Sequence, residues 1–319
     1  MNNIFKKAIQ LIDKSQVIAI ASHIGPDGDN IGSIMAIGKY LEAAGKEVHY
    51  LKHDNIPDYL LFLPGLEKFE QFNELLEPDL FIAVDCAEKK RLGWPEDVFK
   101  KSKRTINIDH HSTNTNFAEI NIVDAEVSST GELIFELLEF SNYVFDSLTA
   151  MYLFTAISTD TGRFLYESTS KRTLEIVAQL IGTGFDRAFV NKALWQSKKM
   201  SEARLYIDAL SKVEFFQNNS LAISTISLKM ASKYHADIEG TEDVINFIRD
   251  IDGIELAVLI KEKKSGVYKV SLRSKEYVDV SNIALKFGGG GHRRAAGFTF
   301  YGNLNELQKQ LYPILTGVM

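Results

Sequence analysis

Short apolar segments alternate with polar, turn-forming segments through the first half of the chain. Segments with the length and composition of β-strands span residues 17–22, 47–52, 80–84, 105–108 and 120–123. Between the first two, residues 32–44 repeat apolar side chains at helical spacing, which predicts an amphipathic helix. Because strands that alternate with helices usually pair in parallel, the pattern predicts an α/β fold with a doubly wound, mainly parallel sheet.

The pattern becomes helical from residue 129 to about residue 212. Ser128-Ser-Thr-Gly-Glu132 has the composition of a helix N-cap, and Asp146-Ser147 begins a second helix. Gly182 and Gly184 end a third helix, because glycine is favoured just beyond a helix C-terminus. The charged residues 197–204 predict a further helix that connects two domains.

The last third of the chain predicts two hairpins. Segments 213–216 and 221–226 flank Gln-Asn-Asn-Ser, and segments 254–261 and 267–273 flank Lys-Lys-Ser-Gly. This change of pattern indicates a second domain of the α+β class. We therefore expect an N-terminal α/β domain over residues 1–190, a helical linker over residues 191–212, and a smaller α+β domain over residues 213–319.

Composition and charge narrow the class of protein. No segment approaches the roughly 20 apolar residues of a membrane span, so we expect no membrane association. The single cysteine, Cys86, excludes an internal disulfide and favours the reducing cytoplasm. The net charge of −6 argues against binding of long duplex nucleic acid, where many phosphates must be neutralised. Short nucleotides stay compatible with this charge, because bound metal ions supply local positive charge.

Acidic residues and histidines follow three of the predicted strands. His23-Ile-Gly-Pro-Asp27-Gly-Asp29 follows the first strand, Asp85 the third, and Asp109-His110-His111 the fourth. Parallel strands in an open sheet deliver their carboxyl ends to one edge, where ligands bind. Histidines and carboxylates that converge on one edge suit a site for two divalent metal ions.

The first cluster supports two interpretations. Gly25, Pro26 and Gly28 should keep this segment out of a helix. Asp27 and Asp29 can then point in different directions and serve two neighbouring ions. The alternative is a solvated Asp-Gly turn with a helix cap.

The other clusters also have simpler alternatives. Asp85 at the tip of a buried strand is costly unless it is paired or bound to metal, although it can also cap a turn. An isolated pair such as His110-His111 can belong to a surface turn, whereas in a shared site imidazole beside carboxylates favours Mn²⁺ over Mg²⁺. Asp160 ends an apolar helix, where its charge opposes the helix dipole, so either solvent or a metal ion must compensate it.

Together these motifs resemble those of the DHH phosphoesterase family. The resemblance rests on the His-x-x-x-Asp-Gly-Asp segment at 23–29, Asp85, Asp109-His110-His111 and Thr159-Asp-Thr-Gly162. Gly288-Gly-Gly-Gly-His292-Arg-Arg-Ala-Ala-Gly297 is similar to the signature of the substrate domain associated with that family. The family includes RecJ exonucleases, family II inorganic pyrophosphatases, cyclic-di-AMP phosphodiesterases and nanoRNases.

The resemblance implies a role for each residue of the site. His23 and Asp27 would hold one metal ion, Asp29, His110 and Asp160 would hold the other, and Asp85 would bridge both. His111 would face the substrate as a catalytic residue, and Asp109 would orient a histidine. The implied cofactors are two Mn²⁺ ions, with Co²⁺ or Mg²⁺ as substitutes.

The same resemblance places substrate binding in the C-terminal domain. Glycines let a backbone approach a ligand closely, and successive N–H groups can bind an anion, although a flexible glycine loop has the same composition. The implied substrate-binding residues are Arg273, Gly289, Gly290, Gly291, His292 and Arg293. Phe164 and Tyr166 could stack on a base, but we expect them to pack in the core. Arg163 and residues 167–170 depart from the family pattern.

Two classes of function follow from this pattern. Among the branches of the family that the motifs resemble, the short two-domain chain favours a nanoRNase, which would release 5′-mononucleotides from very short RNAs and remove the 3′-phosphate of 3′-phosphoadenosine 5′-phosphate. Hydrolysis of cyclic-di-AMP or linear di-adenylate is an alternative, and a non-catalytic nucleotide-binding module is an alternative of another class. The implied partners are short RNA oligonucleotides and nucleotides, with a homodimer left open.

Overall fold

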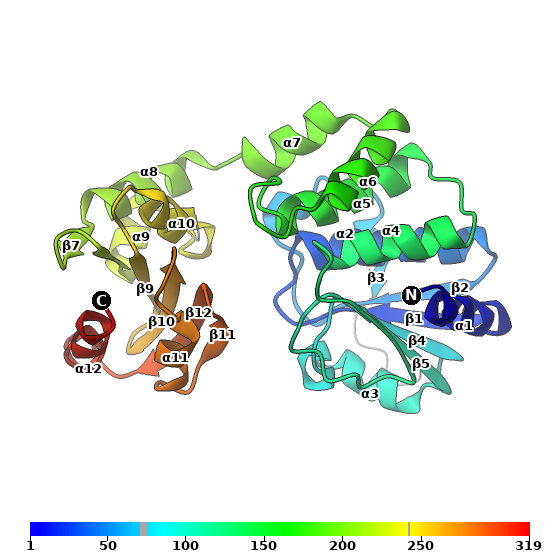
Figure 1. Cartoon of the computed structure of the whole chain (residues 1–319), viewed down its shortest axis with the longest axis horizontal. Helices are drawn as coiled ribbons and strands as arrows, with labels where there is room; N and C mark the ends of the chain where they lie inside the picture. The colour runs from blue at the N-terminus through cyan, green and yellow to red at the C-terminus, as the bar shows by residue number, and fades with distance from the viewer. Residues whose placement is uncertain (71–75, 242) are drawn as a thin grey trace. The chain divides into compact units, whose positions relative to one another are not determined.

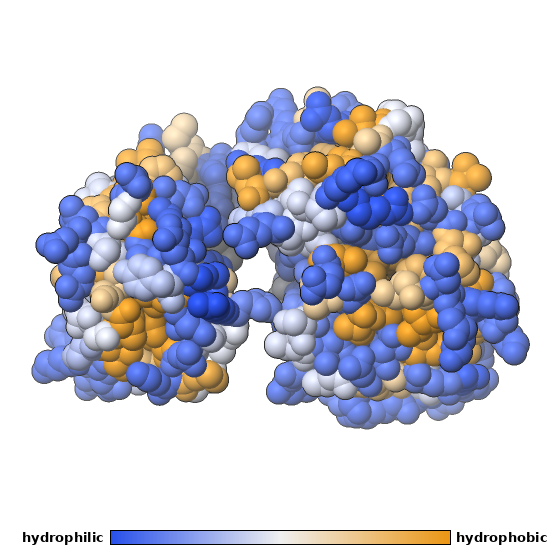
Figure 2. All heavy atoms as spheres, in the orientation of Figure 1, coloured by the Kyte–Doolittle hydropathy of each residue, from blue (hydrophilic) through white to orange (hydrophobic). Residues whose placement is uncertain are grey.

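A computed structural model of the chain describes residues 1–70, 76–241 and 243–319. The chain forms two compact units, Met1–Ser197 and Lys198–Met319 (Figure 1). Each unit has its own sheet, and each is described separately below. Figure 2 shows hydrophilic residues over most of the visible face of each unit, with smaller hydrophobic areas between them. Among the described residues, none of the helices combines the length and the apolar character that a membrane crossing requires.

The N-terminal unit is built on a six-stranded, entirely parallel sheet in the order β3-β2-β1-β4-β5-β6. Its strands are β1 (Val17–Ala21), β2 (Glu47–Leu51), β3 (Phe69–Glu70), β4 (Leu80–Val84), β5 (Arg104–Asp109) and β6 (Ile120–Val123). Five of these strands were predicted from the sequence to within one residue at each end. The doubly wound parallel sheet is therefore confirmed.

The strand order reverses between β1 and β4. The chain first builds outward from β1 to β2 and β3, and then returns to place β4, β5 and β6 on the other side of β1. In open α/β sheets, ligands bind beyond the carboxyl ends of the strands at such a reversal. The segments that follow β1, β4 and β5 are those that carry the histidines and aspartates.

Helices cover both faces of this sheet (Figure 1). They are α1 (Asn2–Lys14), α2 (Gly28–Ala43), α3 (Pro95–Lys101), α4 (Thr130–Phe140), α5 (Ser147–Asp160), α6 (Lys171–Gly182) and α7 (Arg187–Trp195). The larger core packs isoleucines of the strands against α1, α2, α4, α5, α6 and α7. On the opposite face, small residues such as Ala19 and Ala83 pack near α3. The caps predicted at Ser129 and Asp146 are confirmed.

Helices α2, α4 and α5 approach one another through glycines. A Cβ atom at Gly32 of α2 would lie 2.5 Å from the Tyr152 carbonyl oxygen of α5. A Cβ atom at Gly131 of α4 would lie 2.6 Å from the Ala156 Cβ of α5. Both distances are too short for any side chain, so the backbones of these helices are nearly in contact.

The C-terminal unit is built on a mixed six-stranded sheet in the order β11-β12-β10-β9-β8-β7. Its strands are β7 (Glu214–Phe216), β8 (Leu221–Ile226), β9 (Leu256–Lys264), β10 (Val267–Ser274), β11 (Gly290–His292) and β12 (Ala295–Tyr301). Only β8 and β9 pair in parallel. Both predicted hairpins, β7–β8 and β9–β10, are confirmed as antiparallel pairs.

Helices also cover both faces of the second sheet. They are α8 (Met200–Ser211), α9 (Leu228–Tyr234), α10 (Asp243–Asp250), α11 (Val280–Leu285) and α12 (Leu304–Gly317). One core lies between the sheet and α11 and α12, and the other lies beneath α8, α9 and α10. The prediction of a helix over residues 197–204 was wrong at its start. Lys199 is extended, with φ −65° and ψ 141°, so α8 begins only at Met200.

Candidate metal centre

Asp85 lies at the centre of the candidate site. It follows the buried strand β4, and its side chain is only 2% exposed. Its backbone has a φ of 53°, a left-handed conformation that is uncommon for a residue with a side chain. The Asp85 amide donates to the Ile108 carbonyl oxygen at 2.8 Å, which fixes this backbone against β5. Strain of this kind is typical of functional sites, where surrounding structure holds it in place.

His23 and Asp27 face one oxygen of Asp85. His23 Nε2 lies 3.3 Å from Asp85 Oδ2 and 3.8 Å from Asp27 Oδ2. His23 Nδ1 lies 2.8 Å from the Ile24 carbonyl oxygen and donates to it, so a metal ion would replace the proton on Nε2. The three side chains form one compact group of donors.

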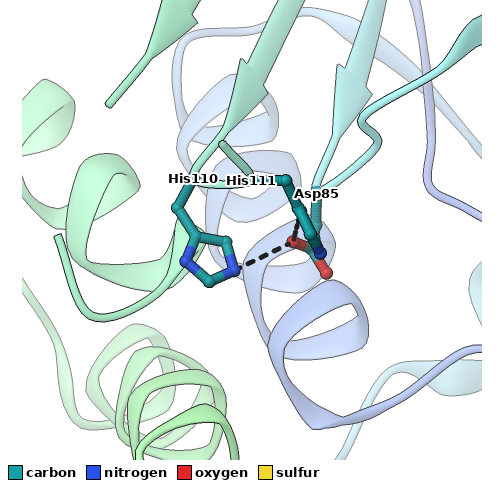
Figure 3. A group of neighbouring side chains, drawn as sticks. All are labelled: Asp85, His110 and His111. Carbon is teal, nitrogen blue, oxygen red and sulfur yellow. Dashed lines mark ion pairs between the residues drawn. The ribbon is translucent and has the colours of Figure 1, made fainter. Parts of the chain in front are cut away.

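The two histidines that follow β5 approach the other oxygen of Asp85, Oδ1 (Figure 3). His110 Nε2 and His111 Nδ1 lie 3.9 and 3.6 Å from Asp85 Oδ1. His111 Nδ1 also lies 2.7 Å from Asp109 Oδ1, and Asn114 donates to Asp109 Oδ2 at 2.6 Å. Asp109 is therefore placed to orient His111.

Asp29, His110 and Asp160 form a further group. His110 Nε2 lies 3.9 Å from Asp29 Oδ2 and 3.4 Å from Asp160 Oδ2. The expectation that residues 25–29 stay outside a helix was wrong for Gly28 and Asp29, which form the first turn of α2. Asp27 accepts a hydrogen bond from the Asn30 amide at 3.0 Å, so it caps the helix and lets it begin directly afterwards.

The Asp29 carboxylate also binds the backbone amides at the start of α4. Its oxygens accept hydrogen bonds from the Thr130 and Gly131 amides at 2.8 and 2.9 Å, and from Ser33 Oγ at 3.1 Å. A carboxylate at the positive end of a helix is favourable, because it meets unpaired N–H groups. Asp29 therefore ties α2 to α4 in addition to facing His110.

Among the four aspartates proposed as metal ligands, three have a raised pKa, with burial as the largest cause. Burial and the negative charge of Asp85 raise the pKa values of Asp27 and Asp29 above their ordinary range. Burial also raises the pKa of Asp160 to about 6, although the charge of His110 opposes the rise. A cation bound among these carboxyls would favour their ionised forms.

The pKa of Asp85, the fourth of these aspartates, is lowered instead. Its burial would raise its pKa, but the hydrogen bond from His23 and the charges of the three histidines hold that pKa below its ordinary range. Burial lowers the pKa of His111, but the hydrogen bond to Asp109 and the charge of Asp85 outweigh it and raise the pKa to about 9. His111 is therefore able to hold a proton at neutral pH.

These residues fit two divalent metal ions. Among the described residues, three overlapping groups of donors lie within 4.8 Å: Asp85 with His110 and His111, His23 with Asp27 and Asp85, and Asp29 with His110 and Asp160. Asp85 belongs to the first two of these groups, and His110 belongs to both the first and the third. A mixed set of imidazoles and carboxylates suits Mn²⁺, and the mutual repulsion of the buried carboxyls would be relieved by cations.

Sequence reasoning missed three contributors to the site. Thr130 Oγ1 donates to Asp85 Oδ1 at 2.9 Å, the Gly131 amide binds Asp29, and Asn114 supports Asp109. The N-cap motif around Ser129 was recognised, but nothing in it shows that α4 points at residues about a hundred positions earlier. Asn114 stands in a run of polar residues, and no local pattern there indicates a role in the site.

The glycine-rich segment before His292 has a different structure from the one the sequence predicts. The sequence predicts a loop, but Gly290–His292 form the edge strand β11, which pairs with β12. A Cβ atom at Gly289 would lie 2.3 Å from the Gly297 carbonyl oxygen, so close backbone packing within the unit requires glycine there. His292 at the end of this strand and Arg293 after it are exposed, and Arg273 is half-buried in β10.

Comparisons with known protein families match both units. The model described as the N-terminal domain of the DHH family matches residues 17–159. The model of the DHHA1 domain matches residues 218–316.

Individual relatives match over most of the chain. The bifunctional oligoribonuclease and PAP phosphatase NrnA of Thermus thermophilus is 35% identical over 287 residues, covering 89% of this chain and 84% of that protein. The Bacillus subtilis protein of the same description is 25% identical over 296 residues, covering 92% of each chain. The crystal structure of an exopolyphosphatase-related protein from Bacteroides fragilis has a TM-score of 0.94 at 26% identity, covering 99% of this chain and 96% of that one.

Proposed function

The chain belongs to the DHH family of phosphoesterases, and we propose that it degrades very short oligoribonucleotides to 5′-mononucleotides with two bound Mn²⁺ ions. We propose as a second activity the removal of the 3′-phosphate from 3′-phosphoadenosine 5′-phosphate. The position of Asp85, with Oδ2 beside His23 and Oδ1 beside His110, carries the two-metal part of this proposal, because each histidine belongs to a different group of proposed ligands. The substrate class is supported by the description of the Thermus thermophilus relative.

The bound ions would activate water and stabilise negative charge on the phosphate. His23 and Asp27 would hold one ion, Asp29, His110 and Asp160 the other, and Asp85 would contact both. His111 has its Nδ1 engaged by Asp109, which leaves Nε2 for the substrate. His111, oriented by Asp109, would be placed to donate a proton to the leaving oxygen.

We further propose that the C-terminal unit binds the end of the substrate away from the scissile bond. Arg273, His292 and Arg293 supply cationic or hydrogen-bonding groups, and the exposed glycines of β11 supply backbone amides. This arrangement is compatible with the negative net charge, because only a short substrate needs to be neutralised.

A competition assay tests the proposed function. The Mn²⁺-loaded protein is given 3′-phosphoadenosine 5′-phosphate, linear di-adenylate, and RNA dimers, pentamers and decamers, and released mononucleotide is measured. We expect rapid release from dimers and little from decamers, with no release by Asp85→Ala. Equal rates for dimers and decamers would contradict the length preference, and full activity of Asp85→Ala would contradict the two-metal site.

A further inference from the structure

A second cavity lies within the N-terminal unit, and none of the candidate metal ligands lines it. It has a volume of about 350 Å³ and is bounded by α5, α6, α7 and the turn after α5. These helices pack side by side in Figure 1. Ligand pockets commonly begin at about 300 Å³, so this cavity has room for a small organic molecule.

Two arginines line the cavity without acidic partners. Arg163 and Arg187, both exposed to solvent, contribute to its wall, and no aspartate or glutamate does. Within the described part of the chain, neither arginine forms an ion pair, whereas Arg172 nearby pairs with both Glu136 and Glu139. Two guanidinium groups that share one cavity without a carboxylate favour an anionic ligand, since the guanidinium fork matches phosphate and carboxylate.

The indole of Trp195 adds an unused donor. Its Nε1 atom is buried and has no hydrogen-bond partner among the residues that the structure describes. A buried donor that stays unpaired destabilises the folded protein, and the indole N–H can only donate. The guanidinium of Arg163 lies over the Trp195 ring at 4.3 Å from its centroid. The Trp195 ring therefore lines the cavity beside a cationic group.

A strained turn supplies the remaining wall. Arg163 and Phe164 have φ values of 65° and 68°, so two consecutive non-glycine residues are left-handed. Such backbone strain is unfavourable, is held in place by the surrounding structure, and clusters at functional sites. The turn places Arg163 over Trp195 and packs Phe164 against Phe154, with ring centroids 6.0 Å apart. Phe164 therefore presents an aromatic surface beside a cationic one.

We propose that this cavity binds a second ligand, a small anion that carries a flat aromatic group, of about the size of a nucleoside monophosphate. Arg163 and Arg187 contact the anionic group, and Phe164 and Trp195 face the ring. The proposal is independent of the phosphoesterase activity, because no candidate metal ligand lines the cavity.

Fluorescence of Trp195 provides a direct test of binding. The chain has two tryptophans, so Trp94→Phe leaves Trp195 as the only indole. The probes are adenosine 5′-monophosphate, ribose 5-phosphate, adenosine and inorganic phosphate, titrated in EDTA to keep the metal centre unloaded. We expect a saturable change with adenosine 5′-monophosphate at an affinity at least tenfold above the other three. Equal affinity for ribose 5-phosphate, or no saturable change at millimolar concentration, would overturn the proposal.

Variants locate the site. Arg163→Gly should weaken binding at least tenfold without lowering Tm, because glycine adopts the left-handed backbone without strain. Arg187→Ala should weaken binding similarly. Lys192→Ala, an exposed cation on the same helix that does not line the cavity, should leave the affinity unchanged. Unchanged affinity in Arg163→Gly and Arg187→Ala, or an equal loss in Lys192→Ala, would show that the ligand binds elsewhere.

Discussion

Asparagine substitutions at Asp27 and Asp29 separate a structural role from a metal-binding role. Both carboxylates belong to the proposed metal groups, but their other contacts differ. Asp27 caps α2 by accepting one hydrogen bond from the Asn30 amide. Asp29 accepts from the Thr130 and Gly131 amides at the start of α4.

The expected magnitudes follow from these contacts. Asparagine caps helices about as well as aspartate, so Asp27→Asn should change the free energy of unfolding by about 0.5 kcal/mol or less in metal-free protein. In Asp29→Asn, the new side chain would keep one acceptor oxygen but turn its NH₂ group toward a backbone N–H, which leaves a buried amide unpaired. That loss costs about 1–3 kcal/mol. Because burial raises the pKa of Asp29, a protonated carboxyl in the metal-free protein would place the cost at the low end.

Urea unfolding with and without Mn²⁺ measures both roles. In EDTA, we expect a lower midpoint for Asp29→Asn and a nearly unchanged midpoint for Asp27→Asn. Added Mn²⁺ should raise the midpoint of the wild type, since a ligand of the folded state stabilises it by mass action, and both variants should lose most of that rise. Equal midpoints for the two variants in EDTA would refute the structural role of Asp29. A full Mn²⁺ response in either variant would refute its role as a ligand.

Four further outcomes are expected. Asp85→Ala should remain folded by circular dichroism and lose hydrolysis, and a rate above about a tenth of wild type would contradict the bridging role. Metal-stripped protein should regain more activity with Mn²⁺ or Co²⁺ than with Mg²⁺, and full activity with Mg²⁺ alone would count against the histidine-rich site. Arg273→Ala should raise KM for RNA dimers more than it lowers kcat and should spare a chromogenic phosphodiester, whereas equal losses would place Arg273 at the metals or in folding. Hydrogen bonds from Lys103 and the Val17 amide hold the pKa of Asp79 below its ordinary value, so its contribution to stability is present above about pH 4 and is lost as pH falls through the folded-state pKa. Asp79→Asn should therefore flatten the acid limb of a stability–pH profile, and an unchanged limb would exclude this contribution.

Local patterns predicted the strands and the positions of the acidic clusters. The parallel strands are short apolar runs bounded by polar residues, so their ends, and with them Asp85 and Asp109, followed directly from the sequence. Convergence on one edge followed from the general geometry of parallel sheets.

The features that the sequence did not predict depend on contacts that local patterns do not encode. The pairing of Asp29 with the Thr130 amide joins residues 101 positions apart, and no local pattern encodes it. Gly28 resembles a helix breaker in isolation, but the cap formed by Asp27 makes it the first residue of α2. The glycines before His292 resemble a loop until β12 is seen beside them, because an edge strand of glycines lacks the usual β-branched residues.

The near contact between helix backbones has a genetic consequence. An alanine at Gly131 would collide with the Ala156 side chain, and a second change, Ala156→Gly, would remove the colliding atom. Damage at Gly131 can therefore be suppressed within the same gene. An alanine at Gly32 would collide with the main-chain carbonyl of Tyr152, which every amino acid carries, so no substitution there relieves it. A substitution at Gly131 can therefore be compensated by a second substitution, whereas a substitution at Gly32 cannot.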